Sequence, residues 1–152
     1  MERALPSLVL ADSSALLYLV EGSPGRRAAV ERFLEESAAG GTRIIASAVA
    51  WAELLERPLA RGDTELAARY RRLLSSSRIE LRVIDVAVAE RAAALGASLP
   101  RSARRALSDA DLFHIATAIV AGADAILGND EAWGSVPDCP PLLLVDELAF
   151  EA

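Results

Sequence analysis

The sequence predicts an α/β fold of three layers, in which helices cover both faces of a mostly parallel sheet of short strands. Three observations lead to this prediction. Short apolar runs bounded by Gly, Asn, Asp or Pro alternate with longer segments of helix formers. Most of the runs are apolar throughout, as expected for strands buried on both faces of a parallel sheet. The helix expected at residues 109–121 is apolar on nearly every side, so it belongs in the interior.

The first half of the chain contains two predicted strands and four predicted helices. The strands are Leu8–Ala11 and Arg43–Ala46, where apolar residues follow one another. Each helix begins or ends at a residue with a known preference for that position. The predicted helices are residues 15–20, which end at Glu21–Gly25; residues 26–39, which end at Gly40; a helix capped by Ser47 that runs toward Pro58; and a helix from Asp63 or Thr64 through Leu74.

The second half contains three predicted strands, two helices and a loop. Ile79–Ile84 alternates apolar and charged residues, which indicates a strand near a sheet edge. Helices are expected at Val86–Leu95 and, starting from Ser108, at Asp109–Ala121. A basic loop is expected between them at Ser98–Ala106. Short apolar runs predict the last strands, at Ala123–Leu127 and Leu142–Val145.

The length and composition favour one globular domain over residues 1–152. The chain has 152 residues, of which 53% are hydrophobic and 25% charged, with a net charge of -6. A membrane span and a secretory signal are not expected, because Asp124 and Asp12 interrupt the candidate apolar stretches. A single cysteine, Cys139, excludes an internal disulfide framework. We therefore expect a cytoplasmic protein.

The residue types that are missing restrict the chemistry further. The sequence has no lysine and one histidine, which removes the P-loop, Schiff-base chemistry and any site that needs two imidazoles. The acidic balance also argues against nonspecific electrostatic capture of nucleic acid. Carboxylates, hydroxyls and arginines remain as the groups that can carry a reaction.

Four acidic residues are predicted to converge at one end of the sheet. Ligand sites in open parallel sheets form beyond the carboxyl ends of the strands. Asp12 directly follows the first strand, Asp130 follows the strand that ends at Leu127, Asp111 lies in the first turn of the buried helix, and Glu53 lies in the helix after the second strand. We interpret Asp109 and Asp124 as helix-start and turn residues outside this cluster.

Each of the four acids also has a purely structural interpretation. Asp12 can cap the helix that starts at Ser13, and Asp130 can cap a short turn through Trp133. Glu53 can form an ion pair with Arg57 one helical turn away. Asp111 can complete a capping box with Ser108. Independent caps, however, have no reason to gather at one end of one sheet.

Convergence of these carboxylates predicts a bound cation. Two carboxylates about 4 Å apart repel by roughly 4 kcal/mol at an effective dielectric constant near 20, so a cluster must bind protons or a cation. Oxygen ligands favour Mg²⁺ or Mn²⁺ over zinc or copper. Such a site is typical of phosphoryl chemistry in which a metal-activated water attacks in line.

Four segments of the chain form an ordered set of motifs: residues 9–16, VLADSSAL; 52–55, AELL; 109–118, DADLFHIATA; and 126–130, ILGND. In this order they resemble the motifs of PIN-domain ribonucleases, and more narrowly those of VapC-type toxins of bacterial toxin–antitoxin pairs. The resemblance implies a PIN-like fold, Mg²⁺-dependent endoribonuclease activity, metal binding by Asp12, Glu53, Asp111 and Asp130, and a cognate VapB-type antitoxin as partner. The family often has a hydroxyl residue two positions before the last acid, where this chain has Gly128, and this departure bears on the orientation of Asp130.

Residues that contact RNA are expected near the acids. Arg101, Arg104 and Arg105 precede the helix that carries Asp111 and can bind phosphates, and Ser13 can position the metal's water. The alternatives are a solvated basic loop and a serine that only begins a helix. His114 is interpreted as a hydrogen-bonded structural residue.

Apolar residues on two consecutive helices can serve a partner. They can form a surface for the antitoxin or a homodimer, or they can be part of the core: Trp51, Leu54, Leu55, Tyr70 and Leu73.

One enzyme class, one signalling domain and one binding module compete with this interpretation. A phosphatase of the haloacid-dehalogenase class needs a second aspartate where this chain has Ser14, and it also needs a lysine. A receiver-like signalling domain needs the same lysine. A catalytically silent PIN-like module that binds RNA or protein remains as the alternative to the nuclease.

Overall fold

The computed structural model describes residues 5–151 of the chain. Its elements, in chain order, are β1 (Leu8–Ala11), α1 (Ser13–Glu21), α2 (Pro24–Gly40), β2 (Arg43–Ser47), α3 (Val49–Ala60), α4 (Thr64–Leu74), β3 (Glu80–Arg82), α5 (Val86–Ser98), α6 (Arg101–Arg105), α7 (Asp109–Ala121), β4 (Ala125–Gly128), the 3-10 helix η1 (Glu131–Ser135), β5 (Leu142–Leu144) and α8 (Val145–Phe150). Among these elements, no helix has the length and apolar character needed to cross a membrane.

The strands form one five-stranded sheet in the order β3-β2-β1-β4-β5. All four neighbouring pairs are parallel. β1 lies at the centre, where Val9 is in register with Ile44 on one side and Ala125 on the other. β3 forms one edge, as its alternating sequence predicts. The prediction of a mostly parallel sheet of short strands is therefore confirmed.

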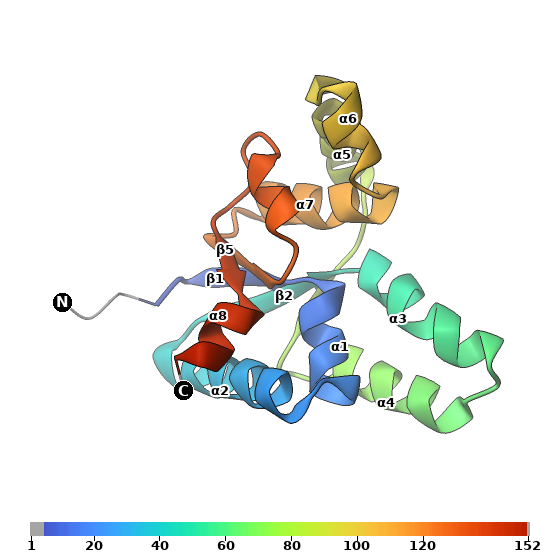
Figure 1. Ribbon diagram of the computed structural model, residues 1–152, viewed down its shortest axis with the longest axis vertical. Helices are drawn as coiled ribbons and strands as arrows, with labels where there is room; N and C mark the ends of the chain where they lie inside the picture. The colour runs from blue at the N-terminus through green and yellow to red at the C-terminus, as the bar shows by residue number, and fades with distance from the viewer. Residues whose placement is uncertain (1–4, 152) are drawn as a thin grey trace.

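Helices cover both faces of the sheet, and this confirms the three-layer arrangement (Figure 1). Successive residues of a strand point to opposite faces. Val9 and Ala11 of β1 pack in a core with residues of α1 to α4 and α8. Leu8 and Leu10 pack in a second core with residues of α5 and α7. The strands are thus buried on both sides, which explains their continuous apolar sequence.

Three local predictions differ from the structure. The expected basic loop contains the end of α5 and the short helix α6, which starts after Pro100 and consists of good helix formers. Val145, predicted as the end of a strand, instead begins α8, where Asp146 and Glu147 favour the amino-terminal end of a helix. Ser47 is the last residue of β2 rather than the helix cap, although its Oγ still accepts a hydrogen bond from the Val49 N–H.

Asp124 anchors the start of the central strand. Its Oδ2 accepts hydrogen bonds from the Ser7 Oγ and from the backbone N–H groups of Ser7 and Leu8, at 2.7, 2.9 and 3.0 Å. These bonds lower the pKa of Asp124 below its ordinary value, with the Ser7 hydroxyl as the largest cause. The ionised carboxylate therefore contributes stability at neutral pH, and this contribution disappears as the pH falls through the lowered pKa.

We expect the Asp124→Ala variant to melt at a lower temperature than the wild type at pH 7. The difference in Tm should narrow as the pH falls below about 3.8, the ordinary pKa of an aspartate. Melting curves followed by circular dichroism over this pH range measure it. Glu35→Ala, at an exposed position, is the control. A Tm difference between Asp124→Ala and the wild type that stays constant with pH would contradict the anchoring role.

Candidate active site

A cleft of about 410 Å³ lies beside the carboxyl ends of β1 and β4, where the fold brings all four predicted acids together. It is lined by Asp12, Ser13, Ser14, Tyr18, Glu53, Asp111, His114, Asn129, Asp130 and Trp133. The acids come from separate parts of the chain, namely the ends of β1 and β4 and the helices α3 and α7. Convergence at this end of a parallel sheet follows from the common direction of the strands.

Asp12 has both a structural role and a place in the cleft. It is the N-cap of α1, and its Oδ1 accepts hydrogen bonds from the Ala15 N–H at 2.9 Å and the Ser14 Oγ at 2.7 Å. The residue is only 4% exposed. Burial raises the pKa of Asp12, and its hydrogen bonds offset this only in part. A buried carboxylate held in this way is stabilised by a nearby positive charge.

The absence of a side chain at Gly128 makes room for the Asp12 carboxylate. A Cβ atom at position 128 would lie 2.3 Å from the Asp12 Oδ2 and 2.6 Å from its Cγ, distances that real contacts do not reach. Gly128 ends β4, next to β1 in the sheet. The departure from the family pattern at this position therefore bears directly on Asp12.

Glu53 binds two side chains of the cleft rather than the arginine on its own helix. Its Oε1 accepts a hydrogen bond from the Ser13 Oγ at 2.7 Å and lies 2.6 Å from the His114 Nε2. Arg57 pairs with Glu21 instead, at 2.6 Å. Burial raises the pKa of Glu53, but the hydrogen bonds from His114 and Ser13 outweigh it and the pKa is lowered overall. Glu53 is thus held ionised across the cleft from Ser13.

Asp111 and Asp130 cap helices as the structural interpretation predicts, and they also line the cleft. Asp111 completes a capping box with Ser108, because its Oδ2 accepts the Ser108 N–H at 2.8 Å. Asp130 is the N-cap of η1 and accepts the Ala132 N–H at 3.0 Å. Capping one helix end occupies one oxygen of each carboxylate and holds the side chain in place. The two interpretations of these acids are therefore compatible.

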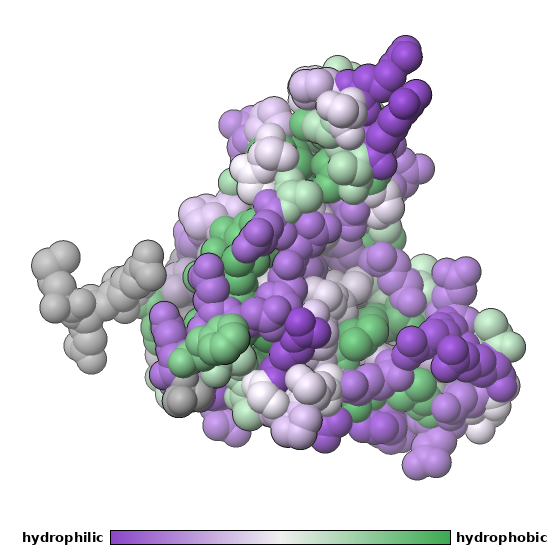
Figure 2. Space-filling view, in the orientation of Figure 1, coloured by the Kyte–Doolittle hydropathy of each residue, from purple (hydrophilic) through white to green (hydrophobic). Residues whose placement is uncertain are grey.

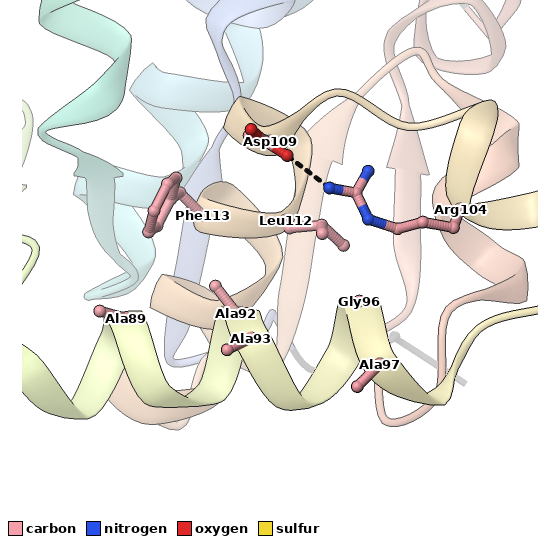
Figure 3. Close-up of a pocket in the computed structure, with 9 residues that line it drawn as sticks. All are labelled: Ala89, Ala92, Ala93, Gly96, Ala97, Arg104, Asp109, Leu112 and Phe113. Carbon is pink, nitrogen blue, oxygen red and sulfur yellow. Dashed lines mark hydrogen bonds and ion pairs between the residues drawn. The ribbon is translucent and has the colours of Figure 1, made fainter.

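The three predicted phosphate-binding arginines lie on α6 and not among the cleft-lining residues. Arg104 forms an ion pair with Asp109 and donates a hydrogen bond to the Leu107 carbonyl at 3.0 Å. It lines a separate groove of about 370 Å³ between α5 and α7, where Figure 3 shows its guanidinium turned toward Asp109 above the small residues of α5. Arg101 and Arg105 are exposed. Hydrophilic side chains gather at the outer end of α6 in Figure 2.

Three further residues line the cleft and were not predicted from the sequence as site residues: Tyr18, Asn129 and Trp133. The Asn129 Nδ2 donates to the Tyr18 hydroxyl at 3.3 Å, while its Oδ1 accepts the Asp146 N–H at 3.1 Å. Asn129 thereby ties the cleft to α8. Trp133 is buried and stacks on the His114 ring, with centroids 5.7 Å apart and an angle of 26° between the rings. The position of Asn129 directly after a strand was an available signal, whereas Tyr18 and Trp133 depend on contacts across the fold.

The apolar residues of α3 and α4 are divided between core and surface. Leu54, Leu55 and Tyr70 are buried in the core. Trp51 and Leu73 are partly buried and pack against it. Core packing thus accounts for three of the residues considered for a partner interface.

The donor atoms of the cleft fit a hard cation that keeps part of its water shell. Within residues 5–151, no group of three or more Asp, Glu, His or Cys side chains is placed to hold a metal ion by itself. Magnesium is usually bound by one or two carboxylates and several waters rather than by an all-protein cage. Carboxylates around a 410 Å³ cleft, one of them buried with a raised pKa, supply this arrangement.

The fold and cleft define a class of three-layer α/β/α domains with an acidic site at the carboxyl ends of the strands. The PIN domain family model matches residues 9–138, and the chain belongs to this family. The comparison with curated protein sequences gives no match.

Several solved structures share the fold. The chain is similar to a structure of VapBC2 from Rickettsia felis bound to a promoter DNA fragment, with a TM-score of 0.69, 18% identity, and 90% of this chain and 98% of that chain covered. It is similar to DNA-bound VapBC from Salmonella typhimurium, with a TM-score of 0.66, 16% identity and coverage of 90% and 97%. A third is VapC20 of Mycobacterium tuberculosis, a toxin that cleaves the sarcin–ricin loop, with a TM-score of 0.61, 15% identity and coverage of 78% and 86%.

Proposed function

We propose that this chain is a metal-dependent endoribonuclease of the VapC type and acts as the toxin of a type II toxin–antitoxin pair. The observation that carries the proposal is the gathering of Asp12, Glu53, Asp111 and Asp130 around one cleft at the end of the sheet. Membership of the PIN family and similarity to structures of VapBC complexes and to an RNA-cleaving toxin support it.

In this proposal the four acids hold Mg²⁺, which Mn²⁺ can replace, in part through water molecules that the cation keeps. The bound cation supplies Lewis-acid activation of water and neutralises charge on the scissile phosphate. Asp12 brings a buried negative charge whose orientation Ser14 and the Ala15 N–H hold. Ser13 orients Glu53 through a hydrogen bond and places its hydroxyl at the cleft, where it can position water. Capping holds Asp111 and Asp130 toward the same space.

The proposal also includes the setting in which the enzyme acts. RNA is the substrate, and exposed Arg101 and Arg105 provide phosphate contacts outside the cleft. A cognate VapB-type antitoxin is the partner, and an arginine-bearing tail would complement the acidic cleft. We further propose a homodimer located in the cytoplasm.

We expect purified protein, freed of antitoxin, to cleave RNA in the presence of Mg²⁺. Cleavage should stop when EDTA removes the metal. The Asp111→Asn variant should cleave about a hundredfold more slowly, because the amide lacks the negative charge. The loss is expected to be smaller than for Asp12, because Asp111 is partly exposed whereas Asp12 is buried. A gel assay on labelled RNA measures the rates, and Asp109→Asn, two residues away on α7 and outside the cleft, is the matched control.

Calorimetry with Mn²⁺ distinguishes the nuclease from a silent PIN-like binding module. A nuclease should bind Mn²⁺ in a way that weakens in Asp111→Asn and not in Asp109→Asn. Wild-type protein that binds RNA but neither binds Mn²⁺ nor cleaves RNA would support the silent module and contradict the proposed function.

A further inference from the structure

His114 is a buried polar residue whose hydrogen bonds all lie in the cleft. It is 1% exposed. Its Nε2 lies 2.6 Å from the Glu53 Oε1 and 3.1 Å from the Ser13 Oγ. Among the residues that the structure describes, its Nδ1 has no hydrogen-bond partner. The imidazole therefore makes its polar contacts through Nε2 alone, with Glu53 and Ser13.

The chemistry of the two partners determines which ring nitrogen carries the proton. An ionised carboxylate only accepts hydrogen bonds, so the His114 Nε2 is the donor of its 2.6 Å contact with Glu53. The Ser13 hydroxyl donates to the same oxygen. Two donors thus converge on Oε1 of Glu53.

The ring is well placed to restrain a side chain that is otherwise mobile. The Glu53 side chain is 35% exposed and has three rotatable bonds, whereas the His114 side chain is 2% exposed and is stacked on buried Trp133. A long exposed side chain loses substantial rotamer entropy when it is held in one position. The fixed imidazole on α7 therefore defines where the carboxylate of α3 lies.

We propose that His114 is a positioning residue that, together with Ser13, holds Glu53 by Oε1 so that Oε2 faces the cleft for a ligand. In the described residues, both hydrogen bonds to Glu53 fall on Oε1. The role as a guide for a cation ligand rests on the proposed function, while the contact itself does not. In this arrangement His114 orients the carboxylate, and Glu53 supplies the negative charge.

The single histidine of the chain permits a direct test by ¹⁵N NMR of the imidazole. We expect metal-free protein to show the tautomer with the proton on Nε2. The Nε2 proton signal should shift in Glu53→Ala and remain in place in Glu56→Ala, an exposed acid on the same helix. A proton on Nδ1 alone, or a signal that does not respond to Glu53→Ala, would overturn the proposal.

Substitution of His114 tests whether the contact matters for cation binding. His114→Phe keeps a ring against Trp133 but removes the donor, and we expect about a tenfold loss of Mn²⁺ affinity, as is typical when a residue that orients a ligand is lost. His114→Gln, whose amide can donate from a similar position, should recover part of the affinity.

Titration calorimetry with Mn²⁺, combined with melting curves, distinguishes a residue that positions Glu53 from a purely structural one. A purely structural residue would lower the Tm in both variants without changing the affinity for Mn²⁺. Unchanged Mn²⁺ affinity in His114→Phe would overturn the positioning role. Wild-type protein that binds no Mn²⁺ would contradict the proposed function, whereas the NMR signal, recorded without metal, still decides on the contact between His114 and Glu53.

Discussion

Asp12→Asn is expected to lose about a thousandfold in the rate of RNA cleavage while the protein keeps its fold. The expected loss is the upper end of what removal of one electrostatic group in an active site costs. Asparagine has the same shape and is as good an N-cap as aspartate, so its Oδ1 can still accept the Ala15 N–H. The substitution therefore removes the charge and leaves the contacts of α1 in place.

Stability provides the second measurement on this variant. Burial raises the pKa of Asp12, so the ionised carboxylate lowers the free energy of unfolding of the metal-free protein at neutral pH. The metal-free Asp12→Asn protein should thus melt at the same temperature as the wild type or higher. Addition of Mn²⁺ should raise the Tm of the wild type but not of the variant. Equal cleavage rates in the two proteins would show that Asp12 is only a helix cap.

Gly128→Ala is expected to disable the site through crowding rather than loss of charge. The added Cβ would lie 2.3 Å from the Asp12 Oδ2, so either the carboxylate or the end of β4 must move. Overpacking of this kind costs about 1–3 kcal/mol of stability. A displacement of about 1 Å in an active site lowers rates roughly a hundredfold, and we expect a loss of that size.

The matched control for this substitution lies a few residues further along. A Cβ at Gly134 would meet only the Leu142 Cδ1, at 3.7 Å, which is an ordinary contact. Gly134→Ala should therefore retain both cleavage rate and Tm. Urea unfolding gives the stability of the two variants, and full activity in Gly128→Ala would show that Asp12 can move without consequence.

Most of the fold follows from local sequence signals. The apolar runs that become β1, β2 and β4 are long enough and distinctive enough to identify, and Asp12, Asp63 and Ser108 mark helix starts that the structure places at the same residues. Two of the three errors lie at short elements. α6 and α8 are so short that capping and contacts with the rest of the protein decide them.

The positions of the four acids were predictable, but their partners were not. Their gathering follows from strand direction, a general property of parallel sheets. The partners of Glu53 depend on packing between α1, α3 and α7, because Ser13 and His114 lie 40 and 61 residues away in sequence. Local spacing favoured Arg57, which the fold instead brings to Glu21. Likewise, the reason for Gly128 is visible only once β4 lies beside β1.

The central position of β1 bears on how the chain folds as it is synthesised. Of the five strands of the sheet, β1 leaves the ribosome first, yet one of its edges stays unpaired until β4 emerges, and the anchor between Leu8 and Asp124 spans 116 residues. Pairing over such a distance is slow compared with helix formation. Asp12 and Asp130 come together only when β4 pairs with β1. A polypeptide that ends before β4 therefore lacks the complete cleft, and any activity of the cleft begins only after Asp130 has been translated.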